Sequence, residues 1–259
     1  MTDIASATPS DPARGDEPDL LPKRLGVWST LGWGLLVFAV TQAVGIIALA
    51  VWNVAHGVEA LAISGYDGAQ IALTTLVINA LQVALLIEIP RWRLGARAFD
   101  YLALTRFSFG NLLIGVVAII AVVAALDGIS HLVRSDTVTP FETDIFTSGR
   151  AEGWLTAVII AVVVVGPIGE EVLFRGFLFR GWVTPGWGGP IGAVAIPVLW
   201  SAMHLQYDWF GMSQVFLIGL VLSWLRWRSG SCLLTIALHM LVNLVGMVEV
   251  ALKVGWSGG

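Results

Sequence analysis

Apolar residues are gathered into seven runs that alternate with short polar segments over most of the chain. The runs lie at about residues 27–52, 71–90, 110–133, 152–182, 190–205, 211–227 and 231–252. A helix that crosses the roughly 30 Å apolar core of a bilayer needs about 20 residues, because each residue adds about 1.5 Å. Most runs meet this length, and those at 190–205 and 211–227 are at its lower margin. The pattern predicts an all-α fold, a polytopic transmembrane helical bundle.

The run at 152–182 is too long for one simple span. Gly166-Pro167 interrupts it, and proline lacks the amide hydrogen that a helix interior uses and clashes with the preceding turn. We therefore expect two helices here and seven or eight helices in total. Pro167 would lie in the first turn of the second helix, where proline is well tolerated.

The composition agrees with a protein whose solvent is lipid. Hydrophobic residues make up 57% of the chain and charged residues only 12%, whereas soluble domains carry roughly a quarter charged residues. The 12 tryptophans suit membrane–water interfaces. The net charge of −4 provides no basic surface for nucleic acid. The single cysteine, Cys232, excludes an internal disulfide and a multi-cysteine metal site.

The chain divides into four segments. Residues 1–26 are rich in Pro, Asp, Ala and Ser and are expected to form a disordered cytoplasmic tail. Residues 27–150 would form the N-terminal transmembrane helices, residues 151–252 the helices that carry the candidate site, and residues 253–259 a short tail. The compact chain with its short tail indicates a bacterial inner-membrane protein.

Basic residues are divided unevenly between the two sides of the predicted bundle. Eleven of the fourteen fall on the side of the N-terminal tail, namely Arg14, Lys23, Arg24, Arg91, Arg93, Arg97, Arg106, Arg175, Arg180, Arg226 and Arg228. Because Lys and Arg are enriched in cytoplasmic loops, this side and the N-terminus should be cytoplasmic.

Ionisable residues inside a membrane are costly, so those within the apolar runs need a reason. Glu171 and Arg175 are four residues apart, on one helical face, and can form a structural ion pair. Glu170 lies about 100° around the helix, free to face a cavity. If Pro167 starts a helix, Glu170 lies near its N-terminus, where the dipole stabilises a negative charge.

Two further polar motifs lie on later apolar runs. Trp200 and His204 end a run that contains Pro197, and His239 and Asn243 share one face of the last run. Each motif alone is as easily explained by contacts between helices. Together, a carboxylate, two imidazoles and an amide on three helices could activate a water and stabilise the oxyanion of peptide hydrolysis.

The motifs Glu-Glu-x-x-x-Arg, aromatic-x-x-x-His and His-x-x-x-Asn, in this order, resemble the CAAX-protease and bacteriocin-processing (CPBP) family, which includes the type II CAAX prenyl endopeptidases. The resemblance covers about residues 150–250 and implies an α-helical intramembrane endopeptidase. It implies that Glu170 and His204 activate water, and that His239 and Asn243 form an oxyanion hole or complete a metal site. Trp200 stands where the family usually has Phe, so an aromatic wall is kept.

The resemblance leaves two forms of catalysis open. In one, Glu170, His204 and His239 hold one divalent metal such as Zn²⁺; in the other, catalysis is metal-independent. No His-Glu-x-x-His motif occurs. The expected partners are the lipid bilayer and a membrane protein or peptide substrate, with no nucleic acid.

A non-catalytic membrane protein is the competing hypothesis: a transporter, or a bacteriocin-immunity or scaffold protein in which the polar cluster binds or stabilises. Polar residues elsewhere in the apolar runs leave room for it, and we interpret them mostly as contacts between helices or interface residues. They are Gln42, Asn79, Gln82, Glu88 and Asp127. Catalysis requires Glu170, His204, His239 and Asn243 in one cavity, whereas a transporter would line a path through both leaflets.

Depth within the membrane presents a difficulty for a shared site. Counted from Pro190 at the expected cytoplasmic end of its helix, His204 would lie about 21 Å deep in the membrane. Counted in the same way from Ser231, His239 would lie about 12 Å deep. Either the helix at 190–205 is tilted, or its direction is the reverse, or it starts later, at Pro197. We favour the later start, which would place His204 at about 10 Å.

Overall fold

The computed structural model describes residues 24–62, 67–95, 97–134, 136–183 and 188–255. Most of the predicted N-terminal tail (1–23) and of the C-terminal tail (256–259) lies outside the described residues. Within the described ranges every regular element is helical, and six helices are long and apolar enough to cross a membrane. The predicted all-α polytopic bundle is therefore confirmed.

The six candidate spans coincide with predicted apolar runs. They are α1 (Val27–Ala55), α2 (Gly68–Leu94), α4 (Phe109–Arg134), the continuous helix Leu155–Trp182, α10 (Trp209–Ser229) and α11 (Cys232–Val254). A seventh apolar helix, α9 (Gly188–Ala202), has only 15 residues and extends about 22 Å, less than the apolar core of a bilayer. Two further helices, α3 (Ala98–Tyr101) and α5 (Pro140–Ala151), lie outside the spans.

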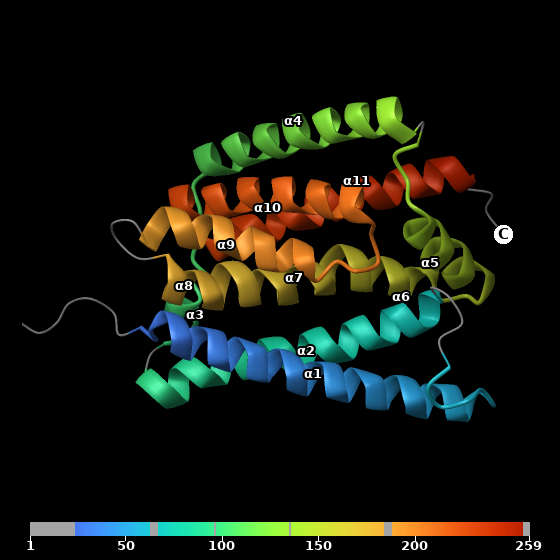
Figure 1. Cartoon of the computed structure of the whole chain (residues 1–259), viewed down its shortest axis with the longest axis horizontal. Coiled ribbons are helices and arrows are strands. Elements are labelled where there is room, and N and C mark those ends of the chain that lie inside the picture. Colours follow the sequence, from blue (N-terminus) through green and yellow to red (C-terminus); the bar gives the residue numbers. More distant parts are fainter. Residues whose placement is uncertain (1–23, 63–66, 96, 135, 184–187, 256–259) are drawn as a thin grey trace, which may run out of the picture.

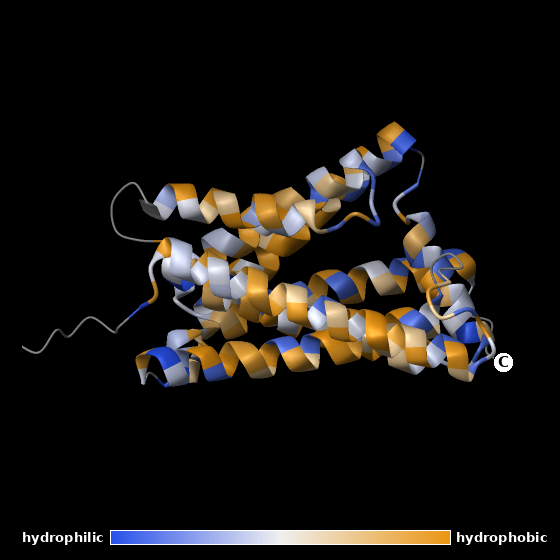
Figure 2. Cartoon of the chain, turned by 60° about the horizontal axis from the view of Figure 1, so that its bottom comes forward, coloured by the Kyte–Doolittle hydropathy of each residue, from blue (hydrophilic) through white to orange (hydrophobic). Residues whose placement is uncertain are grey.

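The long helices run side by side along the long axis of the molecule (Figure 1). The pair α1 and α2 forms one edge, α4 forms the opposite edge, and the helix Leu155–Trp182 runs through the middle. Figure 2 shows hydrophobic residues along the lengths of the helices and hydrophilic residues mostly toward their ends. Large apolar side chains on the outer helices are exposed, including Leu35 and Ile47 of α1 and Val117 of α4. Lipid is the solvent that suits such a surface.

The predicted break at Gly166-Pro167 is wrong. The helix runs unbroken through α6 (Leu155–Ile159), the π-helix η1 (Ile160–Val165), α7 (Gly166–Glu171), the π-helix η2 (Val172–Leu178) and α8 (Phe179–Trp182). In the wide turn of η1 the amide of Gly166 reaches back five residues to the carbonyl of Ala161. Pro167 follows this wide turn, where the usual hydrogen-bond register is already shifted, so its missing amide does not end the helix. Glu170 consequently lies inside a helix, and the argument from a helix N-terminus does not apply.

Side chains from three neighbouring helices bind carbonyl groups of this central helix. The hydrogen bonds run from Gln82 Nε2 to Gly169 O (2.9 Å), from Asn243 Nδ2 to Val162 O (2.8 Å) and from Arg226 Nε to Arg175 O (2.9 Å). A π-turn displaces the helix's own hydrogen bonds, and a buried carbonyl without a partner is costly. These contacts hold the central helix, with its two π-helical stretches, against α2, α10 and α11.

Two of the eleven basic residues assigned to the cytoplasmic side are buried inside the bundle. Arg175 is fully buried, and Arg226 is 6% exposed. Both bind carbonyl oxygens in the core, Arg175 that of Gly219 and Arg226 that of Arg175. They therefore contribute internal contacts rather than charge on the membrane surface.

The expected start of a helix at Pro197 is also wrong. Helix α9 begins at Gly188 and contains Pro197 in its interior. Helix α5, which sequence analysis did not predict, packs at the opposite end of the bundle from α3 (Figure 1). Its residues Ile145 and Phe146 are buried in an apolar cluster with Val158.

Candidate active site

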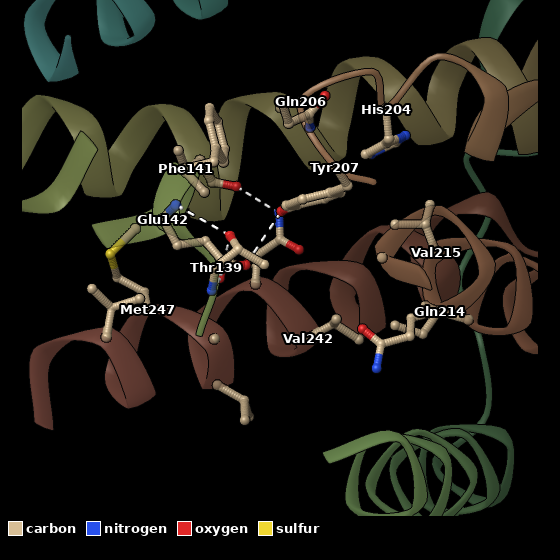
Figure 3. Close-up of a pocket in the computed structure, with 18 of the residues that line it drawn as sticks. Thr139, Phe141, Glu142, His204, Gln206, Tyr207, Gln214, Val215, Val242 and Met247 are labelled. Atoms are coloured by element: carbon tan, nitrogen blue, oxygen red, sulfur yellow. Dashed lines mark hydrogen bonds between the residues drawn. The ribbon is translucent and has the colours of Figure 1, made fainter. Parts of the chain in front are cut away.

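A cavity of about 300 Å³ lies inside the bundle, toward the end where α5 packs. Its wall includes Glu170 of α7, His204 from the turn after α9, and His239 and Asn243 of α11. Figure 3 shows part of this wall, with His204 beside Tyr207. The structure thus brings all four candidate catalytic residues to one cavity.

Glu170 faces His204 across this cavity. Oε2 of Glu170 accepts a hydrogen bond from Trp200 Nε1 at 2.6 Å and lies 4.0 Å from His204 Nε2. The 4.0 Å separation is too long for a direct hydrogen bond, but it suits a bridging water. The Glu170 side chain is 33% exposed and that of His204 is 16% exposed, so solvent can reach both groups.

The ring orientation of His204 is fixed by the backbone. Its Nδ1 lies 2.8 Å from the carbonyl oxygen of Trp200. A carbonyl oxygen can only accept, so Nδ1 carries a proton. In the neutral imidazole Nε2 then keeps its lone pair, which is the state that can accept a proton or a hydrogen bond from water.

A buried ion pair between Glu171 and Arg175 contacts two residues of the site, His239 and Trp200. The four-residue spacing predicted this pair. Arg175 Nη1 binds Glu171 Oε1 at 2.9 Å, and both side chains are 0% exposed. The same carboxylate oxygen lies 3.1 Å from Nδ1 of His239, which donates to it. The Arg175 guanidinium also lies 4.5 Å from the centroid of the Trp200 ring. Glu171 and Arg175 therefore orient His239 and support Trp200.

The indole of Trp200 connects the two histidines. Its ring contacts that of His204 at a centroid distance of 5.0 Å and that of His239 at 5.2 Å, with interplanar angles of 81° and 83°. The two imidazoles therefore share one site through an aromatic ring between helices. A shorter α9 is not needed to bring them together.

Asn243 has a structural contact that sequence analysis did not anticipate. Its amide donates to Val162 O in the π-helical stretch that precedes Pro167. Proline at position 167 cannot donate to this carbonyl, and Gly166 donates to Ala161 instead. One of the two amide hydrogens of Asn243 is thus used, and the other remains for a ligand in the cavity.

The predicted metal ligands do not form a metal-binding group. Among the residues that the structure describes, no group of three His, Cys, Asp or Glu side chains is arranged to hold a metal ion. Oε2 of Glu170 accepts from Trp200, and Nδ1 of His239 donates to Glu171. Oε1 of Glu170 and Nε2 of each histidine are the atoms that would have to converge to hold a metal.

The polar residues outside the motifs have different locations. Gln82 of α2 donates to Gly169 O of the central helix, as expected, whereas Asn79 donates to Thr75 O of its own helix. Glu88 forms an exposed ion pair with Arg91. Asp127 of α4 lines the cavity and shares a hydrogen bond with Glu249 of α11.

Sequence analysis missed Tyr207 and Glu142, which both line the cavity. The Tyr207 hydroxyl donates to Oε1 of Glu142 at 3.3 Å. Burial, followed by the charge of Glu142, raises the pKa of Tyr207 well above its ordinary value, so the phenol remains a donor. The capping pattern Thr139-x-x-Glu142 was the one sequence signal for this region.

Residues 152–245 match the family model of the Rce1-like type II CAAX prenyl endopeptidases. The chain carries an Rce1-like domain. This domain contains every residue of the three motifs and agrees with the CPBP resemblance. The helices α1, α2 and α4, and α5 with Glu142, precede it.

A curated protein from Escherichia coli is also similar to this chain. It is described as an uncharacterized 24.3 kDa protein and is 30% identical over 138 residues. The similarity covers 52% of this chain and 62% of the relative, so less than two thirds of that protein is matched. No solved structure matches the chain.

Proposed function

We propose that this chain is an intramembrane endopeptidase that hydrolyses a peptide bond in a membrane-associated protein or peptide. The observation that carries the proposal is the 4.0 Å approach of Glu170 Oε2 to His204 Nε2 in a cavity that His239 and Asn243 also line. The Rce1-like domain supports the same chemistry, because its family is named for endopeptidases. The polypeptide substrate would enter the cavity from the membrane.

Hydrolysis would begin with a water held between Glu170 and His204. Glu170 takes one proton from this water while the oxygen forms a bond to the carbonyl carbon of the substrate. Negative charge then develops on the former carbonyl oxygen. When the C–N bond breaks, Glu170 returns the proton to the departing nitrogen, which leaves a free amine and a carboxyl group.

His239 and Asn243 would stabilise the oxyanion. The second amide hydrogen of Asn243 can donate into the cavity. His239 donates to Glu171 through Nδ1, so it can also donate through Nε2 when both ring nitrogens are protonated. Fixed donors in a cavity shielded by apolar helices stabilise charge more strongly than water-exposed donors do.

Comparison of membrane proteomes would test this function. Membranes that contain Glu170→Ala, His204→Ala or His239→Ala should accumulate an uncleaved precursor that membranes with the wild-type chain convert to product. Insertion of each variant should be normal. Glu88→Ala is a suitable control, because Glu88 is an exposed carboxylate of α2 outside the cavity. Wild-type cleavage products from Glu170→Ala would exclude the mechanism and leave the non-catalytic alternatives of a transporter, immunity protein or scaffold.

We also propose that the chain resides in a bacterial inner membrane with its N-terminus in the cytoplasm. The side chains of His56 and Arg97 are exposed at opposite ends of α2. A cysteine at each position can be labelled selectively, because the native Cys232 is buried. An impermeant reagent outside spheroplasts should label His56→Cys and leave Arg97→Cys unlabelled; the reverse pattern would invert the topology.

A further inference from the structure

His204 lies in a non-helical turn rather than in a helix. Helix α9 ends at Ala202, and α10 begins at Trp209. Glu170 and His239, in contrast, lie within long helices that fix their backbones. A side chain in such a turn keeps a precise orientation only if other groups hold it.

Three contacts restrict the imidazole of His204, and one of them is the edge-on indole of Trp200 at a centroid distance of 5.0 Å. The hydrogen bond from Nδ1 to Trp200 O, at 2.8 Å, sets the rotation of the ring within its own plane. The ring of Tyr207 lies nearly parallel to it, with a centroid distance of 6.1 Å and an interplanar angle of 12°. This parallel ring and the edge-on indole together restrict the orientation of the plane. The three contacts direct Nε2 toward Glu170.

Tyr207 is in turn held by helix α5. Its hydroxyl donates to Glu142 Oε1, and its ring meets the ring of Phe141 edge-on at 5.9 Å and 90°. Figure 3 shows these three side chains on one wall of the cavity. The tyrosine therefore bridges the turn that carries His204 and a helix that precedes the Rce1-like domain.

Glu142 has a fixed position because it closes the N-terminus of α5. Its Oε2 accepts from the amide of Thr139 at 2.8 Å and from the Thr139 hydroxyl at 2.9 Å. This capping arrangement leaves Oε1 for the phenol of Tyr207. One carboxylate thus joins the cap of α5 to the turn after α9.

We propose that Tyr207 is a positioning residue for His204 and that Glu142 couples it to α5. The inference rests on the proposed function, since it concerns how Nε2 of His204 is directed toward the water that Glu170 activates. It adds a residue outside 152–245, Glu142 of α5, to those that position His204, and so gives α5 a part in catalysis. Without this support the imidazole plane can rotate away from Glu170.

Kinetics of substituted proteins would test the positioning role. Tyr207→Leu removes the ring and should lower kcat about tenfold with KM unchanged, because misorientation affects the reacting geometry and not substrate affinity. Tyr207→Phe keeps the ring and should lower kcat less, by about threefold. Tyr101→Phe, at a tyrosine buried near the opposite end of the bundle, is the matched control and should match the wild type. A rise in KM with kcat unchanged would overturn the positioning role.

The link through Glu142 can be measured by a double-mutant cycle. Glu142→Ala should lower kcat about as much as Tyr207→Phe, or slightly more because it also removes the cap of α5. The double variant should be no slower than Glu142→Ala, because both changes break one hydrogen bond. Multiplicative losses in kcat would show that Glu142 does not act through Tyr207.

A spectroscopic measurement separates this inference from the proposed function. The carbon-13 signal of the His204 ring can be assigned among the four histidines by its loss in His204→Gln. Tyr207→Leu should shift this signal, whereas Tyr101→Phe should leave it unchanged. An unshifted His204 signal would refute the positioning role even if proteolysis is found. A shifted signal in a protein without proteolysis would instead refute the proposed function alone.

Discussion

The indole nitrogen of Trp200 donates a hydrogen bond to Oε2 of Glu170, at 2.6 Å. The same oxygen faces Nε2 of His204. The residue that the resemblance places here is usually Phe, which has no such donor. In this chain an aromatic wall residue therefore also fixes the carboxylate that we propose as the base.

Replacing this indole tests its contribution to catalysis. Trp200→Phe keeps an aromatic ring beside both histidines and removes the hydrogen bond. We expect kcat to fall by about three- to tenfold, because Glu170 gains rotational freedom while its charge is retained. The measurement is kcat with the substrate found by proteomics, alongside thermal unfolding in detergent. An unchanged kcat would show that the bond has no part in orienting Glu170.

The buried ion pair predicts a loss of stability. Glu171→Ala leaves Arg175 charged and without its carboxylate in a fully buried position, which should lower the free energy of unfolding by about 3–5 kcal/mol. His239 loses its hydrogen-bond partner at the same time, so activity should fall as well. Thermal unfolding and expression yield provide the measurement. Normal unfolding with activity alone lost would contradict the structural role.

Close packing of α2 against α7 makes Gly169 sensitive to substitution. A Cβ atom at this position would lie 1.8 Å from Asn79 Oδ1, so Gly169→Ala should force the helices apart and destabilise the protein by about 1–3 kcal/mol. It should also reduce activity, because Glu170 is the next residue. Gly246→Ala in α11 is the matched control, since its Cβ would meet no atom within 4 Å. Equal thermal stability of the two variants would refute this packing argument.

Acid stability should depend in part on Asp208, which caps α10. The amide of Gly211, and then Arg134, hold the pKa of Asp208 below its ordinary value of 3.8. A lowered folded-state pKa adds stability above the unfolded pKa, and this stability is lost as pH falls through the folded pKa. Asp208→Asn should therefore melt at a lower temperature than the wild type near neutral pH, and the difference should shrink below pH 3.8 and vanish once pH is below the folded-state pKa. A difference in melting temperature that persists in acid would point to another cause.

Metal dependence can be decided directly. The side chains of Glu170, His204 and His239 are not arranged as a metal-binding group. We expect chelator treatment to leave proteolysis unchanged and metal analysis to find no stoichiometric zinc. Zinc that co-purifies with the wild type and disappears in His204→Ala would reverse this expectation.

Short-range patterns in the sequence predicted much of the fold and part of the site. Apolar runs of sufficient length identified the helices, because the bilayer requires them. The four-residue spacing of Glu171 and Arg175 identified their ion pair, because helical geometry alone brings such residues together.

Predictions failed where a single residue was judged without its neighbours. Pro167 and Pro197 were expected to end or begin helices, and both lie in helix interiors. For Pro167, the π-turn before it and the amide of Asn243 supply the compensation, and neither is visible in the local sequence. Counting residues along each helix also could not show that the ring of Trp200 contacts both His204 and His239.

The sequence by itself determined the class of fold, the positions of the long apolar runs and the residue types available for catalysis, since these follow from apolar length and from spacing within one helix. Only the tertiary structure decided how Glu170 faces His204, that Asn243 binds Val162, and that α5 supplies Glu142 to Tyr207. These contacts join residues far apart in the chain. Their geometry depends on how whole helices pack, and local sequence does not encode that packing.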